Sequence, residues 1–325
     1  MKDLKTLQEA ILYFGNHDNC LEYMVALRWP DGVTCPTCGR KDVVFLKNQR
    51  KWQCKSVHGH RQFSAKVGTI FEDSPLPLDK WLMAAWMIGN DKNGISSWEI
   101  HRALDVTQKT AWFMGHRIRL AMQRGTFLKV GGNLEVDETF IGGKARFMHK
   151  AKREQKIHGR GAVGKVVVMG ILQRKKKDGS PSQMMAQVIE NRDAETLQGI
   201  VKENVRKGSK LYSDEFSGYT GLENDYDHQV INHAEEYVRG LVHTQGADNF
   251  WSLLKRGLHG TYVSVEPFHL FRYIDEQSFR FNNRGNKTHP MNDGDRFRLI
   301  MSQVAGKRLT YKQLTGKQSV VEKPF

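Results

Sequence analysis

The sequence predicts a mixed α/β protein whose main sheet is preceded by a small metal-held ribbon and a helical region. Three observations support this fold class. All four cysteines lie before residue 55, a helical pattern covers residues 78–124, and strand and helix patterns alternate from Leu134 onward. Alternating strands and helices are typical of an α/β layer with a central mixed sheet. A length of 325 residues also exceeds what one minimal module needs.

Changes in composition along the chain suggest where its parts begin and end. Pro75 and Pro77 mark one join, and the Gly131-Gly132 pair marks a second. We expect an N-terminal helical segment (1–30), a zinc ribbon (31–75), a helical, helix-turn-helix-like region (76–128), an α/β domain (131–290) and a polar C-terminal tail (291–325).

The charge of the chain favours a polyanionic partner. Its formal net charge is +15, and a basic protein attracts nucleic acid and releases counterions on binding. An unspecialised basic surface is the alternative. No stretch is apolar for long enough to cross a bilayer, and the first residues lack the pattern of a secretory signal. We therefore expect a cytoplasmic, nucleoid-associated protein with no membrane partner.

The clustered cysteines predict a structural zinc site. Cys35 and Cys38 form a CxxC pair, and Cys54 follows after fifteen intervening residues, with His58 four positions later. Two short-spaced pairs of sulfur and nitrogen ligands suit tetrahedral Zn²⁺, and four protein ligands leave no position for water. His60 is an alternative fourth ligand. Cys20 has no nearby partner and is interpreted as a buried apolar residue.

Residues 94–122 have the pattern of two helices joined by a turn. Ser96 or Ser97 can cap the first helix, and Thr107 can cap the second. The second helix carries the basic residues His116, Arg117 and Arg119 at helical spacing. This outline fits a helix-turn-helix whose second helix enters a major groove, although any helical hairpin has the same pattern.

The region after Leu134 supplies the predicted sheet. Apolar or alternating runs predict strands at 134–142, 165–173, 183–189, 209–214 and 228–233, with a hairpin turn at Asp178-Gly179. Helical patterns cover 194–204, 247–258 and 267–281. Periodicity alone does not choose among the α/β folds that contain these elements.

Acidic residues at the ends of two of these strands predict a second metal site. Asp137 and Asp214 each lie near the end of an apolar strand, and the later helix offers Asp248, with Lys255 two turns further on. Carboxylates are the ligands that Mg²⁺ and Mn²⁺ prefer. Paired divalent ions serve phosphoryl transfer, in which one ion readies the attacking oxygen and the other stabilises the leaving oxygen. We therefore expect two such ions, with Lys255 contacting a phosphate.

Several separate motifs resemble the ISXO-type insertion-sequence transposases. They are CPTCG, QFSAKVGTIFEDS, KNGISSWEIHRALDVTQKTAWFMGHRIR, VDETFIGGK, LYSDEFSGY, HAEEYVRG, NFWSLLKRGLHGTY and FRFNNR, spread over roughly residues 15–285. The resemblance implies a zinc ribbon, a helical DNA-binding region and an RNase-H-like catalytic core that uses Mg²⁺. It assigns Asp137 and Asp214 as the first two catalytic acids. It also implies binding to double-stranded DNA at transposon ends and in the target, and we expect a homo-oligomer on that DNA.

One segment departs from the family pattern. Where the family usually reads HTNGIENFW, this chain reads HTQGADNFW over residues 243–251, so that Asp248 stands in place of Glu and Ala247 in place of Ile. Aspartate can ligate Mg²⁺, but its carboxylate is one methylene shorter. The expected function is metal-dependent cleavage and transfer of transposon ends. The alternative is a weakened or inactive DNA-binding protein derived from a transposase.

Residues 144–177 form a basic insert between the first two acids. They hold 12 Lys/Arg and a single acid, Glu154. A basic, glycine-containing segment beside the catalytic strand is interpreted as a loop that engages DNA, and a solvated loop is the alternative.

Overall fold

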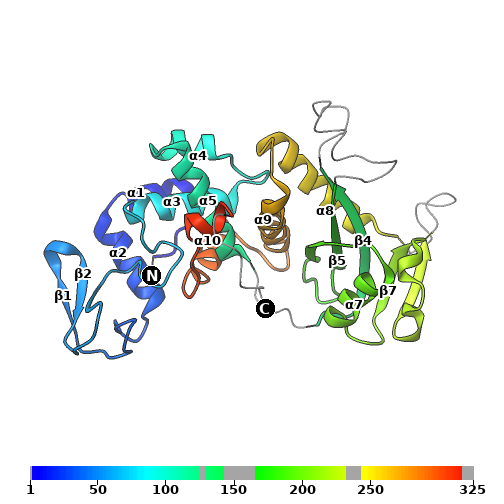
Figure 1. Ribbon diagram of the computed structural model, residues 1–325, viewed down its shortest axis with the longest axis horizontal. Helices are drawn as coiled ribbons and strands as arrows, with labels where there is room; N and C mark the ends of the chain where they lie inside the picture. Colours follow the sequence, from blue (N-terminus) through cyan, green and yellow to red (C-terminus); the bar gives the residue numbers. More distant parts are fainter. Residues whose placement is uncertain (1, 124–128, 143–164, 232–242, 317–325) are drawn as a thin grey trace. The chain divides into compact units, whose positions relative to one another are not determined.

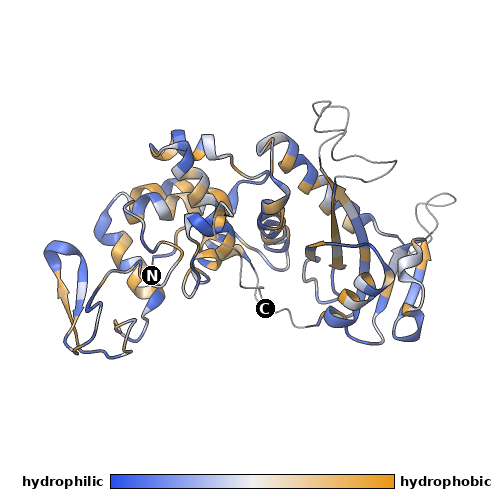
Figure 2. Ribbon diagram, viewed as in Figure 1, coloured by the Kyte–Doolittle hydropathy of each residue, from blue (hydrophilic) through white to orange (hydrophobic). Residues whose placement is uncertain are grey.

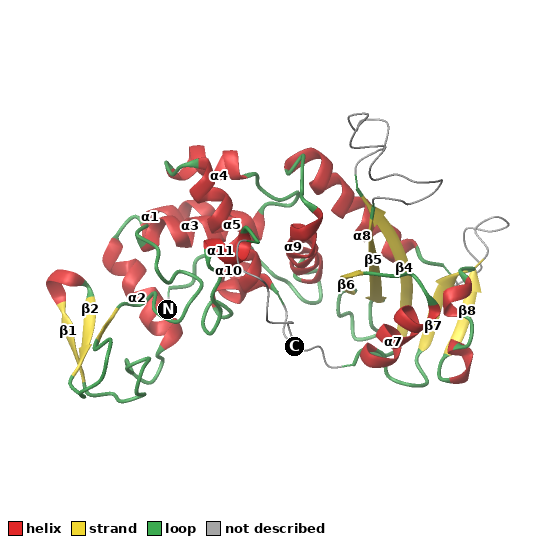
Figure 3. Cartoon of the chain, viewed as in Figure 1, coloured by secondary structure: helices red, strands yellow, loops and turns green. Residues whose placement is uncertain are grey.

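The computed structural model describes residues 2–123, 129–142, 165–231 and 243–316. The chain divides into two compact units (Figures 1 and 3). Unit 1 consists of residues 1–123 and 291–325, and unit 2 consists of residues 124–290. Each unit is described below by itself.

Two helices open unit 1, where the sequence pattern had suggested one. Helix α1 (Leu7–Phe14) begins with a capping box at Thr6. Helix α2 (His17–Arg28) begins after Asn16, whose side chain accepts a hydrogen bond from Asp18 N. Gly15 ends the first helix. An Asn side chain that bonds to the next turn competes with helix continuation, which explains the break.

The ribbon that follows is built from three short antiparallel strands, β1 (Val43–Leu46), β2 (Lys51–Cys54) and β3 (Gln62–Phe63), in that order. A 3₁₀ turn, η1 (Lys47–Gln49), joins β1 to β2. Trp52 pairs with Phe63 across the strands, and both rings contact Trp29. The ribbon therefore has a small aromatic cluster besides its cysteines.

Three helices make up the centre of unit 1: α3 (Leu78–Asn90), α4 (Ser97–Leu104) and α5 (Gln108–Met122). The predicted caps are present. Ser96 forms a capping box with Glu99 at the start of α4, and the Thr107 side chain accepts from Thr110 N at the start of α5. Asp105, with φ of 48°, ends α4 in the left-handed region and allows the tight turn between the helices.

The basic residues of α5 are not available to a DNA groove, contrary to the prediction. His116, Arg117 and Arg119 are all buried, at 0%, 5% and 4% exposure. Arg117 donates hydrogen bonds to the carbonyl oxygens of Leu309 and Glu72, at 3.0 and 2.8 Å. Distant segments of the chain cover this helix, so its charges serve the packing of unit 1.

The C-terminal segment, expected as a polar tail, contributes to the core of unit 1. Helix α10 (Asp293–Met301) packs against α3, and its Phe297 joins an aromatic cluster with Phe14, Tyr23 and Trp86. Gly294 permits the contact, because a Cβ there would lie 1.7 Å from the Leu4 carbonyl oxygen. A short helix, α11 (Tyr311–Leu314), follows.

Unit 2 is a mixed α/β domain around one five-stranded sheet with the order β6-β5-β4-β7-β8. The strands are β4 (Asn133–Ile141), β5 (Val166–Gln173), β6 (Gln183–Ile189), β7 (Lys210–Asp214) and β8 (Asp227–Ile231). Strands β4, β5 and β6 pair antiparallel, whereas β4, β7 and β8 pair parallel. The mixed sheet predicted from the sequence is thus observed.

Helices cover both faces of this sheet. Helix α7 (Ala194–Asn204) packs its Leu197 and Val201 on one face, against residues such as Leu134 and Val136 of β4. Helices α8 (Gln245–Arg256) and α9 (Leu270–Asn282) cover the other face. Figure 2 shows apolar residues concentrated along β5, the strand between β4 and β6. Because side chains alternate along β4, Glu135 and Asp137 face the α8 side.

Part of the basic insert, predicted as a loop, is a strand. Its residues 144–164 lie outside the described part of the chain, as does the whole of the HAEEYVRG motif. Residues 166–173, in contrast, form strand β5, which is hydrogen-bonded on both edges. The Asp178-Gly179 turn is present, with Gly179 at φ of 86°. No helix in the described residues is long and apolar enough to cross a membrane.

Candidate metal and catalytic sites

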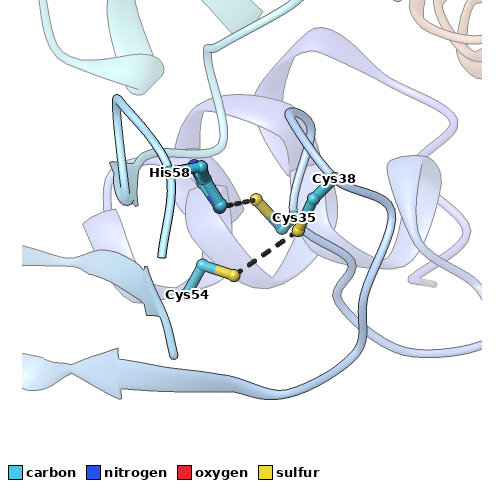
Figure 4. Close-up of side chains that lie close together, drawn as sticks. All are labelled: Cys35, Cys38, Cys54 and His58. Atoms are coloured by element: carbon cyan, nitrogen blue, oxygen red, sulfur yellow. Dashed lines mark hydrogen bonds between the residues drawn. The ribbon is translucent and has the colours of Figure 1, made fainter. Parts of the chain in front are cut away.

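Four ligand-type side chains meet in the ribbon. The donor atoms of Cys35, Cys38, Cys54 and His58 all lie within 4.8 Å of one another (Figure 4). Cys35 Sγ is 3.5 Å from His58 Nε2, and Cys38 Sγ is 3.6 Å from Cys54 Sγ. The set includes His58 and not His60, which resolves the alternative left by the sequence.

Local backbone structure aims these ligands at one point. Gly39 N donates to the Cys35 carbonyl at 2.8 Å, and Gly39, at φ of 72°, turns the chain back after the CxxC pair. Although burial raises the pKa of the Cys54 thiol, hydrogen bonds from His58 and Ser56 outweigh it and lower that pKa to about 6. Thiolate is the form that binds metal. Cys20 is buried elsewhere, as predicted.

The predicted acids come together in unit 2. Asp137 of β4, Asp214 at the end of β7, and Asp248 and Lys255 of α8 all line one pocket of about 460 Å³. Asp248 is exposed and Lys255 half-buried. Among the described residues, only the ribbon set has three or more donor atoms within 4.8 Å of one another, so the three acids are spaced more widely.

Acidic side chains outnumber basic ones among the described residues that line the pocket. Burial, followed by the charge of Asp248, raises the pKa of Asp137 to about 7, and Glu138 and Asp214 add smaller effects in the same direction. Asp248 therefore acts on Asp137 more strongly than Asp214 or the adjacent Glu138 does. Mutually repelling carboxylates around one pocket are the environment in which a hard cation binds.

Trp251 of α8 orients Asp137. Its indole Nε1 donates to Asp137 Oδ2 at 2.9 Å, while Glu138 N donates to Oδ1 at 2.8 Å. Gly170 of β5, which pairs with Asp137 in the sheet, makes room for the ring. A Cβ at Gly170 would lie 2.7 Å from Trp251 Cζ2. A glycine inside a central strand is explained by this close approach.

A buried carboxylate anchors the first turn of α8. Glu135 is 1% exposed, and its Oε2 accepts from Ala247 N at 2.9 Å, while its Oε1 lies 2.6 Å from Arg174 Nε. Negative charge at a helix N-terminus is stabilising. Gly246 allows the approach, since a Cβ there would be 2.9 Å from Glu135 Oε2 and 2.8 Å from Leu172 Cδ2. Glu135 thus fixes the turn that carries Asp248 to the strand that carries Asp137.

Glu138 is a further acid of the pocket lining. Tyr219 donates to its Oε2 at 2.7 Å, and Arg192 Nε lies 3.3 Å from its Oε1. The Arg192 guanidinium stacks over Phe216 at 3.5 Å. Burial raises the pKa of Glu138, and Tyr219 and Arg192 act against this rise. These partners hold Glu138 away from solvent beside Asp137.

Sequence reasoning missed Glu135, Glu138 and Trp251. Glu135 had a signal, because a residue two positions before Asp137 on a strand faces the same side of the sheet. Trp251 and Gly170 had none, because their contact joins residues far apart in the chain. Asn249 and Glu215, which directly follow the predicted ligands Asp248 and Asp214 in the chain, are not part of the pocket lining.

Comparison with known proteins identifies both parts of this arrangement. The model of the ISXO2-like transposase domain matches residues 129–282, and that of the transposase zinc-ribbon domain matches residues 15–58. The chain belongs to the ISXO2-like transposase family. The transposase domain model covers the five-stranded sheet and the acid-lined pocket, and the zinc-ribbon model covers the Cys₃His set.

Two relatives agree with this family. The chain is 25% identical over 256 residues to an uncharacterized protein of the transposable element ISH50 from Halobacterium salinarum, covering 75% of this chain and 84% of that protein. It is 32% identical over 97 residues to an uncharacterized transposase-like protein of Haemophilus influenzae, covering 30% of this chain and 78% of that protein.

Proposed function

We propose that this transposase cleaves DNA at transposon ends and joins the freed 3′-hydroxyls to target DNA, with an RNase-H-like unit 2 as its catalytic domain. One observation carries the proposal. Asp137, Asp214 and Asp248 come from two strands and a helix, yet they line one pocket together with Lys255. The mixed sheet and its helices are consistent with the RNase-H-like fold.

The acids of the pocket fit a pair of Mg²⁺ or Mn²⁺ ions. Such ions, when bound, ready an attacking oxygen and stabilise a leaving oxygen in phosphoryl transfer. Asp137, Asp214 and Asp248 would hold them. The raised pKa of Asp137 supports this assignment, because cations at this point would relieve the repulsion that raises it.

Protein groups around the acids position the reacting partners. Trp251 and the Glu138 backbone amide fix both oxygens of Asp137, so that this carboxylate enters the reaction in one orientation. Lys255, seven residues after Asp248 on α8, contacts a phosphate oxygen of the DNA. The pocket contains no other Lys or Arg in its described lining, which makes Lys255 the cation nearest the reacting phosphate.

In unit 1 we propose a structural Zn²⁺ held by Cys35, Cys38, Cys54 and His58, whose close donor atoms and lowered Cys54 pKa suit it. The helix pair α4–α5 is proposed to bind duplex DNA through exposed residues near the turn, such as Arg102 and Lys109, since the basic residues further along α5 are buried. Assembly as a homo-oligomer on DNA belongs to the same proposal.

A cleavage assay tests the proposal. The purified chain is incubated with duplexes taken from both flanks of its gene, with Mg²⁺, with Mn²⁺ or with EDTA. We expect cleavage at a terminal inverted repeat in either metal and none in EDTA. A labelled target duplex in the same reaction should receive the cut end.

The alternative is a DNA-binding protein that no longer cleaves, and the shorter, exposed Asp248 is the observation that favours it. Binding of the inverted repeat without cleavage in either metal would establish this alternative. Cleavage without transfer would instead indicate a simple nuclease.

A further inference from the structure

The sheet of unit 2 has a second pocket at the end opposite the acids. It has a volume of about 720 Å³ and is lined by residues at the starts of β4, β6 and β7 and the end of β5. From Asn133 to Asp137 on β4, and from Lys210 to Asp214 on β7, the chain advances four residues. At roughly 3.3 Å per residue, the two pockets are about 13 Å apart along these strands.

This pocket is strongly basic. Among the described residues that line it, five are cationic and none is acidic; the cations are Lys129, Lys176, Arg206, Lys207 and Lys210. Lys207 and Lys210 are ion-paired with Asp225 and Asp227 nearby, at 2.8 and 3.5 Å. The other three therefore account for most of the net positive charge.

Two of the cations are held in place without being neutralised. Lys129 Nζ donates to the Lys202 carbonyl at 2.8 Å, and Arg206 Nε donates to the Lys129 carbonyl at 2.9 Å. A carbonyl oxygen fixes a cationic side chain but leaves its full charge available to an anion. Since the side chains are already ordered, binding an anion costs less conformational entropy.

The backbone frame of the pocket is also ordered. Val130 and Val205 form a parallel bridge, through Val130 N to the Asn204 carbonyl and Arg206 N to the Val130 carbonyl, both 2.8 Å. Gly132 and Gly208 have φ of 91° and 76°, and a Cβ at either would meet no atom within 4 Å. Bare backbone at these points lets a bulky anion approach closely.

We propose that this pocket binds the phosphate backbone of duplex DNA, in a segment separate from the reacting phosphate. The inference rests on the proposed function, in which DNA is the polyanionic substrate that this chain binds. Among the described residues that line the pocket, none has an aromatic side chain on which unpaired bases could stack, which favours a duplex over a single strand. Helices α7, α8 and α9 cover both faces of the sheet, so the DNA at the two pockets follows different paths.

The test is a binding measurement in EDTA, so that no cleavage intervenes. The full chain is titrated with a fluorescent duplex of about 30 base pairs of unrelated sequence at several salt concentrations. The variant is Lys129→Gln with Arg206→Gln. The matched control is Lys2→Gln with Lys5→Gln, which removes the same charge from exposed positions of unit 1.

We expect the pocket variant to bind the duplex roughly tenfold more weakly at about 0.1 M salt. The slope of log affinity against log salt should fall in magnitude by about 2, because each of the two lost phosphate contacts contributes about 0.9 to that slope. The control should keep the wild-type slope. Lys176→Glu, an exposed loop substitution that leaves the frame intact, should also weaken binding. Wild-type slopes and affinities in both pocket variants would overturn the inference.

Cleavage of a short end duplex at saturating protein separates this inference from the proposed function. We expect the pocket variant to need a higher protein concentration than wild type before cleavage reaches its plateau, because its changes weaken DNA binding about 13 Å away from the acids. A loss of cleavage that persists at saturating protein would show that the pocket acts through the catalytic strands and is not a separate site. If the wild type never cleaves, the proposed function fails, while the binding result still decides on the pocket.

Discussion

The proposed zinc ligands of the ribbon and the proposed Mg²⁺ ligands of the sheet are arranged in opposite ways. The ribbon ligands already lie within 4.8 Å of one another, on short strands and turns that pack on one small aromatic cluster, which includes Trp29, Trp52 and Phe63. The acids stand further apart, on a sheet and helix whose positions are set by two apolar cores.

This difference indicates which structure depends on the metal. A small ribbon gains much of its folding free energy from its ion. The sheet of unit 2 folds through apolar packing and carries its acids at an electrostatic cost, seen in the raised pKa of Asp137. Removing a ligand from the ribbon should therefore unfold the ribbon. Removing a ligand from unit 2 should abolish DNA cleavage but leave unit 2 folded.

The largest effect is expected at the acids. Asp137→Asn and Asp214→Asn should each lower cleavage by more than the roughly 100-fold that outer-shell changes at metal sites cause. Each should leave DNA affinity within about twofold, since the change removes one charge and keeps the shape. Gel-shift and cleavage assays on the same preparations measure both. A parallel loss of binding would assign these acids to the fold instead.

In the ribbon, Cys35→Ser should abolish zinc binding and unfold residues around β1 to β3, while unit 2 keeps its melting transition. Elemental analysis should find one zinc per wild-type chain and none in the variant. The aromatic contacts of Trp29, Trp52 and Phe63 are expected to delay this unfolding without preventing it. Cys20→Ser, at a buried cysteine outside the set, is the control and should retain zinc. A zinc-free wild type with an ordered ribbon would refute the prediction.

The third acid tests how closely the helix and the sheet are fitted. The charge of Asp248 already raises the pKa of Asp137, and Gly246 and Ala247 let α8 approach Glu135. We therefore expect the longer side chain of Asp248→Glu to carry its carboxylate too far into the pocket and to lower cleavage about tenfold. Gly246→Ala should push the first turn outward and lower it similarly. The double variant should recover activity, because the longer side chain offsets the displaced helix.

General damage to unit 2 would not be repaired by Asp248→Glu, so the recovery distinguishes fit from stability. Gly199→Ala in α7, where a Cβ meets nothing within 4 Å, is the matched control and should be neutral. The affinity for Mn²⁺, measured from the electron paramagnetic resonance spectrum of the free ion, should fall in each single variant and recover in the double variant. Additive losses in the double variant would contradict this account.

The smallest effect concerns stability without metal. The pKa of Asp137 is raised from 3.8 to about 7, so its carboxyl destabilises the fold increasingly as pH rises through this window, fully above pH 7. In EDTA, Asp137→Asn should therefore stabilise unit 2 at pH 8, by a few kcal/mol at most. The gain should vanish near pH 4. Thermal melting at the two pH values checks this, and an equal gain at both would refute it.

The sequence predicted elements with strong local signals better than contacts between distant segments. The strands that carry Asp137 and Asp214, the helix caps at Ser96 and Thr107, and the Cys₃His spacing were all readable, because each depends on nearby residues. Asp214 ends its strand as predicted, whereas Asp137 lies in the middle of β4 and not near its end. The burial of Arg117 was not readable, since residues near Leu309 cover it. Likewise, the hydrogen bond from Ala247 N to the Glu135 carboxylate joins residues 112 positions apart. Periodicity identifies a polar face but cannot tell which distant segment will cover it.

The return of the chain into unit 1 has a consequence for synthesis on the ribosome. Helix α10 completes the aromatic cluster around Trp86 and Phe297, yet it follows the whole of unit 2 in the chain. Domains generally fold in the order in which they emerge. Unit 1 therefore waits, incomplete, until unit 2 has been translated. A chain terminated before residue 293 would lack α10 and so could not complete the core of unit 1.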